Sequence, residues 1–537
     1  MIPRSRSSVI KYPTNSKESL KDEEPELVKL DLSKKNIKEF PMNNQLVKSL
    51  NASSNKLSKL SEQMITALLS YQRLKSLDLS NNFLTSFPEE LRKLRQLEDL
   101  KLFYNRFQNN EDIKPILSLP KLKNLDLSQN KLTSLPNKFP PKIEVLTLDF
   151  NMLKKLEKIS IPTLTRLSLV LTQLEYVSPD LSFPNLTFLD LSRNSLATLP
   201  DLVKFAPRLE IINLSSNFFP ELPIPPLTIR EYIIKSNYLI ELPENLSSFV
   251  NLRSLDVSHN FIEFIPPLPP SIISLVFSSN RVKATAPCKT PNLQRLYLRN
   301  NQLTSYPQYD KLQIKEYSAG FNQITIIRPL FFSDIISRID FTDNQIIEIP
   351  SFVYKLPNLT ILVVSKNRIR TISNDIIKLK HIQTFNITEN PIEILPPLPI
   401  SLVSFYAGYC DLKELPDLKK NTNLHVFSAP GNDLATYPNA PNLKTVNLSR
   451  NRFINFPSLV FIAKYYSKLE DFDMSFNFIR HIPSNLTMDK LEELDLSFNS
   501  IKSFPDDFNL PKLKFLKLGS NPISLSPTRK IIQEEIL

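Results

Sequence analysis

The sequence predicts an α/β solenoid, a curved stack of short repeats with a parallel β-sheet on its concave face and irregular, polyproline or short helical segments on its convex face. Three observations predict this fold. The pattern L-x-x-L-x-L-x-x-N-x-L recurs along the chain. Its steps run from 19 to 27 residues, which is typical of solenoid repeats. The 537 residues include only 4 glycines but 44 prolines, so proline is expected to make most of the turns.

The L-x-L part of each repeat is the predicted strand. Side chains alternate along a strand, so the two apolar residues, for example Leu77 and Leu79, face the interior. The residue between them points to solvent. Strands of successive repeats are expected to stack in parallel, about 4.8 Å apart.

The asparagine at the ninth position is predicted to be buried where the chain leaves the strand. Its amide both donates and accepts, so it can satisfy backbone groups of adjacent turns. Asparagine occupies this position in 20 of 23 repeats, and the exceptions are Lys35, Thr172 and Cys410. Cys410 is predicted to be a buried structural thiol rather than a reactive one.

The segment after the asparagine returns along the convex side. An apolar residue and a proline often lie there, as in Phe87-Pro88, and proline sets the turn because its φ is fixed. The proline-rich segments 265–270 and 395–399 are predicted to be polyproline-like. Segments 61–69 and 459–466 have the apolar spacing of short helices.

Three segments follow from the pattern. The repeats, about 23 of them, fill residues 27–523. Residues 1–26 lack the pattern and are polar, which predicts a disordered or loose N-terminal cap. In residues 524–537, Thr528 can N-cap a C-terminal capping helix, and the alternative is a helix that leads into a further domain.

The formal charge of +12 would suit nucleic acid or an anionic membrane if it were concentrated on one surface. The outward residue of the strands, however, is lysine only at Lys101 and Lys517. It is aspartate in eight repeats, at Asp31, Asp78, Asp126, Asp190, Asp256, Asp340, Asp473 and Asp495. Such a face offers no phosphate track, so no nucleic-acid partner is predicted.

The cellular compartment of the protein is predicted from three features that the sequence lacks. No apolar run approaches the length of a membrane span, and the polar N-terminus does not look like a signal peptide. Two cysteines, Cys288 and Cys410, make no disulfide framework. The expectation is a monomer in the cytoplasm.

The sequence predicts no catalytic site. No phosphate-binding loop or zinc-ligand spacing occurs. Asp256, Ser258 and His259 lie close together, but the same Asp-x-Ser spacing recurs as ordinary strand filler at Asp78 and Asp126. The sequence therefore predicts no enzyme, no catalytic residue, no cofactor and no metal.

The repeats of residues 27–523 resemble leucine-rich repeats. Residues 242–262 resemble those of the intracellular Ras group, which includes Scribble-type scaffolds, and the short repeats with Pro-Pro-Leu-Pro resemble those of bacterial effectors of the YopM type. The resemblance implies a non-catalytic protein-binding scaffold or regulatory subunit in intracellular signalling, with a small GTPase or a protein phosphatase as partner. Two alternatives remain open: the recognition arm of a larger signalling enzyme, and an extracellular recognition protein.

A candidate contact surface lies on the concave face between residues 295 and 409. Gly320, Gly408 and Gly431 mark three unusual repeats there. The candidate protein-binding residues are Arg295, Tyr297, Arg299, Phe321, Val363, Tyr406 and Tyr409. Exposed aromatics beside arginine are typical of interface centres. The alternative is that these aromatics only fold over neighbouring turns. A second, smaller group is Phe103, Tyr104 and Phe150.

Overall fold

The structure is a computed structural model that describes residues 28–42, 46–305, 309–310, 313–328, 334–505 and 507–523. The described chain forms two compact units. Unit 1 ends at Lys131 and also contains Phe139–Ile143, whereas unit 2 contains Leu132–Lys138 and the chain from Glu144 onward. The predicted N-terminal cap (1–26) and C-terminal capping helix (524–537) lie outside the described residues.

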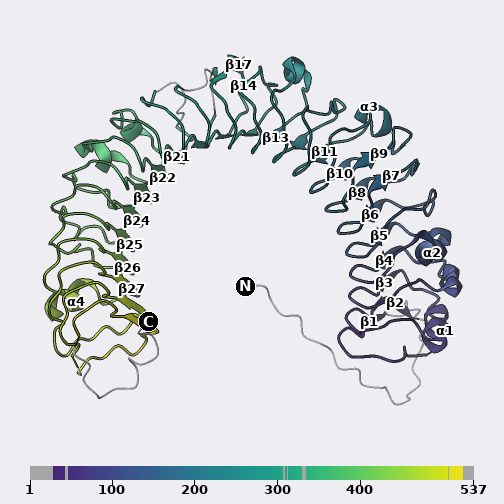
Figure 1. The fold of residues 1–537 in the computed structure, drawn as a ribbon, viewed down its shortest axis with the longest axis horizontal. Helices are drawn as coiled ribbons and strands as arrows, with labels where there is room; N and C mark the ends of the chain where they lie inside the picture. The colour runs from purple at the N-terminus through teal and green to yellow at the C-terminus, as the bar shows by residue number, and fades with distance from the viewer. Residues whose placement is uncertain are drawn as a thin grey trace, which may run out of the picture. The chain divides into compact units, whose positions relative to one another are not determined.

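Unit 1 contains a parallel sheet whose strands pair in chain order. The strands are β1 (Val28–Asp31), β2 (Val47–Asn51), β3 (Ser76–Asp78), β4 (Asp99–Lys101) and β5 (Asn124–Asp126). The helical turns α1 (Glu62–Ser70), η1 (Glu89–Lys93), α2 (Asn110–Ile113) and η2 (Lys114–Ser118) belong to the segments between strands. Figure 1 shows α1 and α2 on the side away from the sheet.

Unit 2 continues the same design with three-residue strands, each paired in parallel with the next. They are β6 (Val145–Thr147), β8 (Arg166–Ser168), β10 (Phe188–Asp190), β11 (Ile211–Asn213), β12 (Glu231–Ile233), β13 (Ser254–Asp256), β15 (Ser274–Val276), β18 (Arg295–Tyr297), β20 (Glu316–Ser318), β21 (Arg338–Asp340), β22 (Ile361–Val363), β23 (Thr384–Asn386), β24 (Ser404–Tyr406), β25 (Val426–Ser428), β26 (Thr445–Asn447), β27 (Asp471–Asp473), β28 (Glu493–Asp495) and β29 (Phe515–Lys517). Within the unit they line the concave side, as predicted (Figure 1).

The return segments of unit 2 contain little regular structure. Among the described residues of these segments, three pairs of two-residue strands occur: β7 (Lys155–Leu156) with β9 (Tyr176–Val177), β14 (Phe264–Ile265) with β16 (Ala284–Thr285), and β17 (Cys288–Lys289) with β19 (Tyr309–Asp310). The helical turns are α3 (Leu202–Phe205), η3 (Glu244–Ser248), η5 (Val353–Lys355), η6 (Asn374–Lys378) and α4 (Leu459–Tyr465). The proline-rich segments 265–270 and 395–399 contain no α-helix or 3-10 helix, and Ile265 belongs to β14.

Both predicted helices are confirmed, and each begins at a serine. Ser61 accepts the N–H of Met64 at 3.2 Å before α1. Ser458 accepts the N–H of Phe461 at 3.3 Å before α4. A serine hydroxyl at this position satisfies one of the backbone donors that a helix leaves free at its start.

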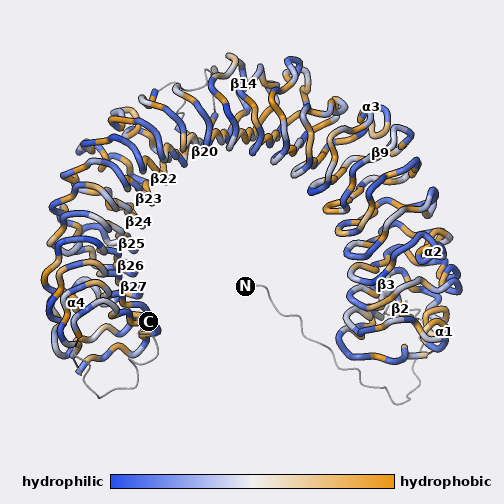
Figure 2. The backbone as a smooth tube through the Cα atoms, viewed as in Figure 1, coloured by the Kyte–Doolittle hydropathy of each residue, from blue (hydrophilic) through white to orange (hydrophobic). Residues whose placement is uncertain are grey.

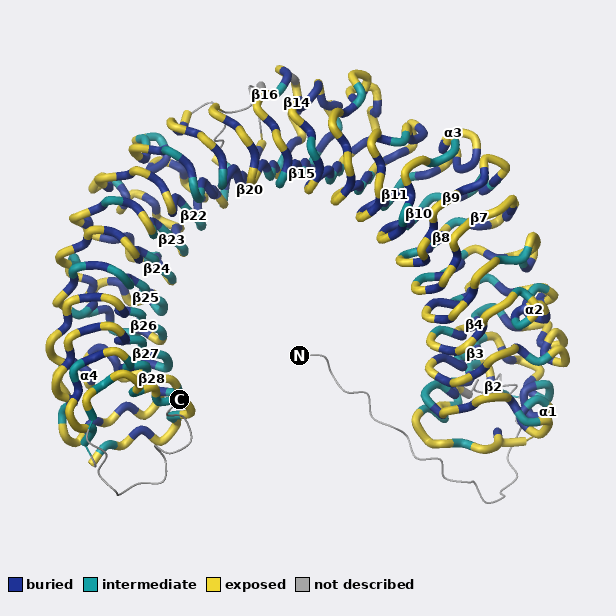
Figure 3. The backbone as a smooth tube through the Cα atoms, viewed as in Figure 1, coloured by how far each residue is buried: buried dark blue, intermediate teal, exposed yellow. Residues whose placement is uncertain are grey.

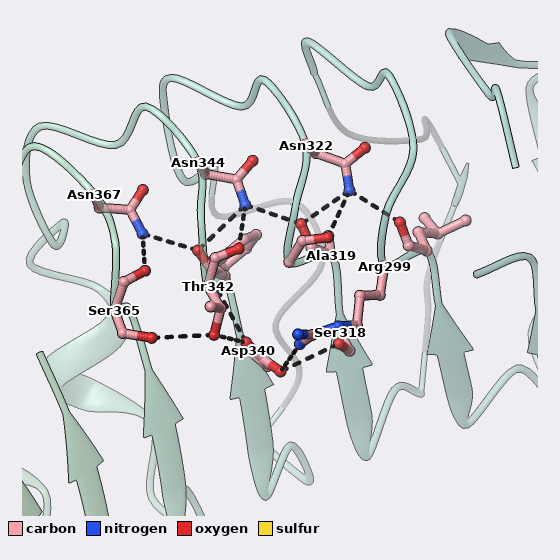
Figure 4. Close-up of polar contacts among 12 residues, drawn as sticks. Arg299, Ser318, Ala319, Asn322, Asp340, Thr342, Asn344, Ser365 and Asn367 are labelled. Carbon is pink, nitrogen blue, oxygen red and sulfur yellow. Dashed lines mark hydrogen bonds and ion pairs between the residues drawn. The ribbon is translucent and has the colours of Figure 1, made fainter. Parts of the chain in front are cut away.

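The interior is built from the leucines and asparagines of the pattern. Figure 3 shows the buried residues recurring in every turn, and Figure 2 shows apolar and polar residues alternating rather than gathering in one block. Asn344 is typical. Its Nδ2 donates to the carbonyls of Phe341 (3.2 Å) and Ala319 (3.0 Å) (Figure 4). Its Oδ1 accepts the N–H of Ile324 at 2.9 Å. The buried asparagine thus links two turns, as predicted, because its amide can donate and accept together.

The residue before the asparagine adopts a left-handed backbone conformation in every described repeat, with φ between 50° and 64°. Only Gly431 is a glycine there, whereas tyrosine, phenylalanine, arginine and lysine occur at this position in other repeats. The cost of about 1 kcal/mol per residue is offset by a ladder of backbone hydrogen bonds, such as Phe321 N–H to Thr342 O at 2.6 Å. The expectation that proline replaces glycine is therefore incomplete, because ordinary residues make the turn that follows each strand.

Candidate functional site

All seven predicted contact residues lie on or beside the concave sheet of unit 2, but the structure does not bring them together. Arg295 and Tyr297 lie on β18, whereas Tyr406 lies on β24. Five strand steps separate β18 from β24, which corresponds to about 24 Å. The residues therefore form two groups, with Val363 on β22 nearer to the second.

In the first group, Tyr297 is engaged within the chain. Its hydroxyl donates to Oε2 of Glu316 on the neighbouring strand at 2.5 Å. Burial, assisted by the Glu316 carboxylate, raises the pKa of Tyr297 to about 12. Arg295 places its Nε 3.4 Å from Oγ of Ser274 on the strand before it. These contacts fix both side chains across the sheet.

The side chain of Arg299 extends across two neighbouring repeats and contacts a residue in each. Its guanidinium lies 4.2 Å from the centre of the Phe321 ring, and its Nη1 lies 3.6 Å from Oδ2 of Asp340 (Figure 4). A Cβ on residue 320 would lie 3.0 Å from the carbonyl oxygen of Thr342, so glycine at this position permits the close approach of the next repeat, whereas the 3.5 Å to Nη1 of Arg299 would be an ordinary van der Waals contact. The first group is thus largely satisfied by contacts within the chain.

The side chains of the second group are more accessible to a partner protein. Tyr406 is half-buried on β24, and Tyr409 is 53% exposed just beyond the same strand. The ring of Tyr409 lies over Gly431 of the next repeat, where a Cβ would stand 2.5 Å from Cδ1 of the ring. Glycine at 431 therefore makes room for the aromatic ring.

The sheet around Tyr406 lacks charge. The outward side chains of β22 to β26, hereafter the uncharged strip, are Ile361, Val363, Thr384, Asn386, Ser404, Tyr406, Val426, Ser428, Thr445 and Asn447. Every one of them is half-buried. Elsewhere on the concave sheets of the described residues, every pair of consecutive strands has at least one charged residue at an outward position. The strip ends at Arg338 and Asp340 on β21, and at Asp471 and Asp473 on β27.

Two aromatic ladders were missed by the sequence analysis. Tyr238 lies between Phe218 and Phe261 with ring centres 5.9 Å away on either side, and Arg281 stacks over Phe261 at 4.7 Å. Phe476 and Phe498 stack in parallel at 4.0 Å, and Arg450 lies 4.0 Å from the Phe476 ring centre. Each ladder occupies one pattern position in successive repeats, so comparing that position between repeats would have found it.

The smaller predicted group, Phe103, Tyr104 and Phe150, is divided between the units. Phe103 and Tyr104 belong to unit 1 and Phe150 to unit 2. Tyr104 and Phe150 are both exposed, and both occupy the left-handed position before the asparagine.

The groups with catalytic potential have structural partners. Ser258 donates its hydroxyl to Oδ1 of Asp256 at 2.6 Å, and Ser80 makes the same bond to Asp78. This supports the interpretation of Asp-x-Ser as a strand-end motif. Burial raises the pKa of Cys410 to about 11, and its thiol contacts the carbonyl of Ile387 at 3.5 Å, as expected for a structural cysteine.

The described part of the chain contains no group of three or more His, Cys, Asp or Glu residues that is placed to hold a metal ion. None of its helices has both the length and the apolar character needed to cross a bilayer.

Comparison with protein families identifies leucine-rich repeats in the chain. The family model "Leucine Rich Repeat" matches residues 73–94, 121–141, 185–205 and 251–275. The model "Leucine Rich repeats (2 copies)" matches residues 489–528. The matches coincide with the repeat pattern that defines the strands.

Solved structures show the same fold. YopM from Yersinia enterocolitica WA-314 is 26% identical, with a TM-score of 0.64 over 87% of this chain and 91% of that chain. The leucine-rich-repeat ectodomain of the Arabidopsis thaliana receptor kinase GASSHO1/SCHENGEN3 is 23% identical, with a TM-score of 0.55 over 91% of this chain and 64% of that chain. The predicted similarity to the YopM type is thus confirmed.

Among curated proteins, the adenylate cyclase of Schizosaccharomyces pombe is 24% identical over 327 residues, which is 58% of this chain. The chain spans only 17% of the length of that cyclase. The solenoid is therefore shared with proteins of very different size, and the Ras-group resemblance stays a prediction.

Proposed function

We propose that this chain of leucine-rich repeats is a non-catalytic scaffold or regulatory subunit that binds a partner protein on the uncharged strip. Leucine-rich-repeat proteins generally mediate protein–protein interaction, and stacked repeats present one continuous surface for it. The observation that supports this site is the loss of charge over five consecutive strands, β22 to β26.

The composition of the strip suits the centre of an interface. Charged residues are depleted from interface cores, where tyrosine is enriched. Tyr406 supplies such a side chain within the strip, and Tyr409 supplies a second at its border with a large exposed surface. Tyrosine also loses little conformational entropy on binding, because only two side-chain torsions must be fixed.

The charged borders of the strip suit a polar rim. Arg338 lies on one side, beside the buried Asp340, and Asp471 and Asp473 lie on the other. Polar and charged residues at a rim orient a partner, whereas the core provides most of the affinity.

The proposal includes a cellular location and a class of partner. We place the protein in the cytoplasm, in a signalling assembly with a small GTPase or a protein phosphatase. The resemblance to Ras-group repeats supports the partner class. The free buried thiol of Cys410 is consistent with a reducing compartment.

The test compares partner capture by two matched double variants. Tyr406→Ala with Tyr409→Ala removes both tyrosines, and Ile347→Ala with Ile394→Ala removes two exposed side chains from the return segments. Proteins retained from cell extract are quantified by mass spectrometry, with circular dichroism to confirm folding. The proposal expects specific partners to be lost only with the tyrosine variant. Equal capture by both folded variants would contradict it.

A second function, the recognition arm of a larger signalling enzyme, is favoured by one observation. The adenylate cyclase that resembles this chain over 327 residues is far longer than the part it shares. The intact mass of the native protein, measured after purification from its source, decides between the two. A mass well above 61.9 kDa with cyclase or kinase activity would favour the second.

A further inference from the structure

We infer that the concave face of β27 and β28 is a docking surface for a lysine- or arginine-rich segment of the partner protein. The inference rests on the proposed function, because it assigns a partner chemistry to the surface that adjoins the uncharged strip. Four carboxylates form this surface, hereafter the carboxylate block: Asp471, Asp473, Glu493 and Asp495.

The strand register sets the carboxylates in a two-by-two array. Asp471 pairs with Glu493 and Asp473 with Asp495 across the parallel strands, which are about 4.8 Å apart. Like charges at directly opposite positions repel each other and destabilise a sheet. No other described strand has two acidic outward residues, although the chain as a whole is basic. A cationic ligand would relieve this local repulsion.

The chain itself neutralises little of the block. Among contacts of the described residues, only Asp495 has an ion pair, with Lys517 at 3.5 Å. Asp473 accepts the Ser475 hydroxyl at 2.7 Å, and Asp471 accepts the Thr445 hydroxyl at 3.2 Å. Hydroxyl bonds leave the negative charge in place, so the block remains available to a cation.

The surface is also hollowed. A depression of about 180 Å³ opens over β26 to β29, with the block as its centre. Thr445 and Asn447 bound it toward the uncharged strip, and Phe515 and Lys517 bound it on the other side. A hollow of this size can admit an ammonium or guanidinium head with part of its stem.

The neighbouring aromatic ladder shows that a guanidinium fits beside the block. Arg450 already stacks on one end of the ladder, at Phe476. Phe498 forms the other end, where it is 49% exposed and the next repeat offers only Ser520 at the same position. A partner arginine can therefore stack on Phe498 while neighbouring basic side chains pair with the block.

The order of surfaces along the sheet gives the partner segment a direction. The uncharged strip precedes the block, so the segment is expected to place apolar residues over β22 to β26 and basic residues over β27 and β28. Electrostatic complementarity of this kind steers association and makes it sensitive to salt.

The test uses a neutralised block and a control with the same charge change. The block variant is Asp471→Asn, Asp473→Asn, Glu493→Gln and Asp495→Asn. The control is Asp78→Asn, Asp126→Asn, Asp190→Asn and Asp256→Asn, at strand positions distant in the repeat order. Asparagine fits this strand position, because Asn213 and Asn447 accept the same serine N–H and hydroxyl bonds as the aspartates do.

The probe is a fluorescently labelled peptide with an apolar half and an arginine-rich half, and binding is measured by anisotropy at low and physiological salt. We expect the block variant to bind about tenfold more weakly than the wild type, with a smaller salt dependence, and the control to stay within about twofold. A version of the peptide with glutamate in place of arginine should not bind.

Three results separate this inference from the proposed function. No binding of the arginine-rich peptide to the wild type, or equal weakening in block variant and control, would overturn the docking surface. If partner capture still depends on Tyr406 and Tyr409, the proposed function survives that failure. If peptide binding depends on the carboxylate block but partner capture is unchanged by the tyrosine substitutions, the docking surface is supported and the proposal that the partner binds on the uncharged strip is contradicted.

Discussion

The ring of Tyr409 lies directly over the α-carbon of Gly431, so close that a Cβ on residue 431 would stand 2.5 Å from Cδ1 of the ring. Both residues occupy the left-handed position before the ninth residue of their repeats, with φ of 50° and 64°. The pair shows how a side chain on the concave rim depends on the residue one repeat further on.

Replacing Gly431 by alanine should therefore displace Tyr409 as well as strain the backbone. We expect Gly431→Ala to lower the free energy of unfolding by about 1–3 kcal/mol, from overpacking and the left-handed φ together. Urea unfolding followed by circular dichroism measures it. Gly519→Ala is the control, because nothing lies within 4 Å of its added Cβ, and an equal loss in both variants would refute the contact.

The buried asparagines at the ninth position of the repeats, hereafter the asparagine ladder, should contribute strongly to the free energy of unfolding. Asn344→Ala removes three donated bonds and one accepted bond, and leaves the buried N–H of Ile324 without its acceptor. The expected loss is about 2–4 kcal/mol, judged by urea unfolding, because unsatisfied buried groups are costly. Asn423→Ala, which removes one exposed bond to the carbonyl of Ile400, should cost less than about 1 kcal/mol. Similar losses of unfolding free energy in the two variants would contradict a dominant contribution of the buried asparagines to stability.

Stability should fall in alkali. Burial raises the pKa of Tyr354 to about 12 and the pKa values of Tyr232 and Tyr466 well above 10. Above pH 10 the unfolded tyrosines lose their protons while the folded ones keep them, so stability present below pH 10 is lost as pH rises toward 12 and beyond. The slope approaches about 1.4 kcal/mol per pH unit for each such tyrosine. Urea midpoints between pH 8 and pH 11.5 test this, and a constant midpoint would contradict it.

Cys410 should be unreactive in the folded protein. Its thiol is buried and has a pKa of about 11, so little thiolate exists at neutral pH. In a Cys288→Ser background, we expect a thiol reagent at pH 8 to label Cys410 only at the rate of unfolding, and rapidly in urea. Fast labelling without urea would show that the ninth position of this repeat opens readily.

Much of the fold follows from the sequence, because the repeated pattern places one strand per repeat and gives each strand its neighbours. The repeat order in the sequence also places Tyr297 and Tyr406 five strands apart. The left-handed backbone conformation of the eighth residue of each repeat, which precedes the asparagine, could not be predicted from the sequence pattern. Lys34, Tyr104 and Gly431 share that conformation because hydrogen bonds between turns impose it, not because of their side chains.

The contact of Arg299 with Asp340 could not be predicted either. It depends on a side-chain conformation that spans two strands. The uncharged strip, by contrast, is visible in the sequence once the outward positions of successive repeats are compared. The predicted contact surface is defined by aromatic residues at these positions and not by their missing charge.

The most direct test of the central claim is photo-crosslinking from the uncharged strip. The photoreactive amino acid p-benzoylphenylalanine is placed at position 406 on β24 in one protein, and at position 394, an exposed site in the segment between β23 and β24, in another. The account predicts a discrete crosslinked partner from position 406 and none from position 394. A partner crosslinked only from position 394 would contradict binding on the concave sheet.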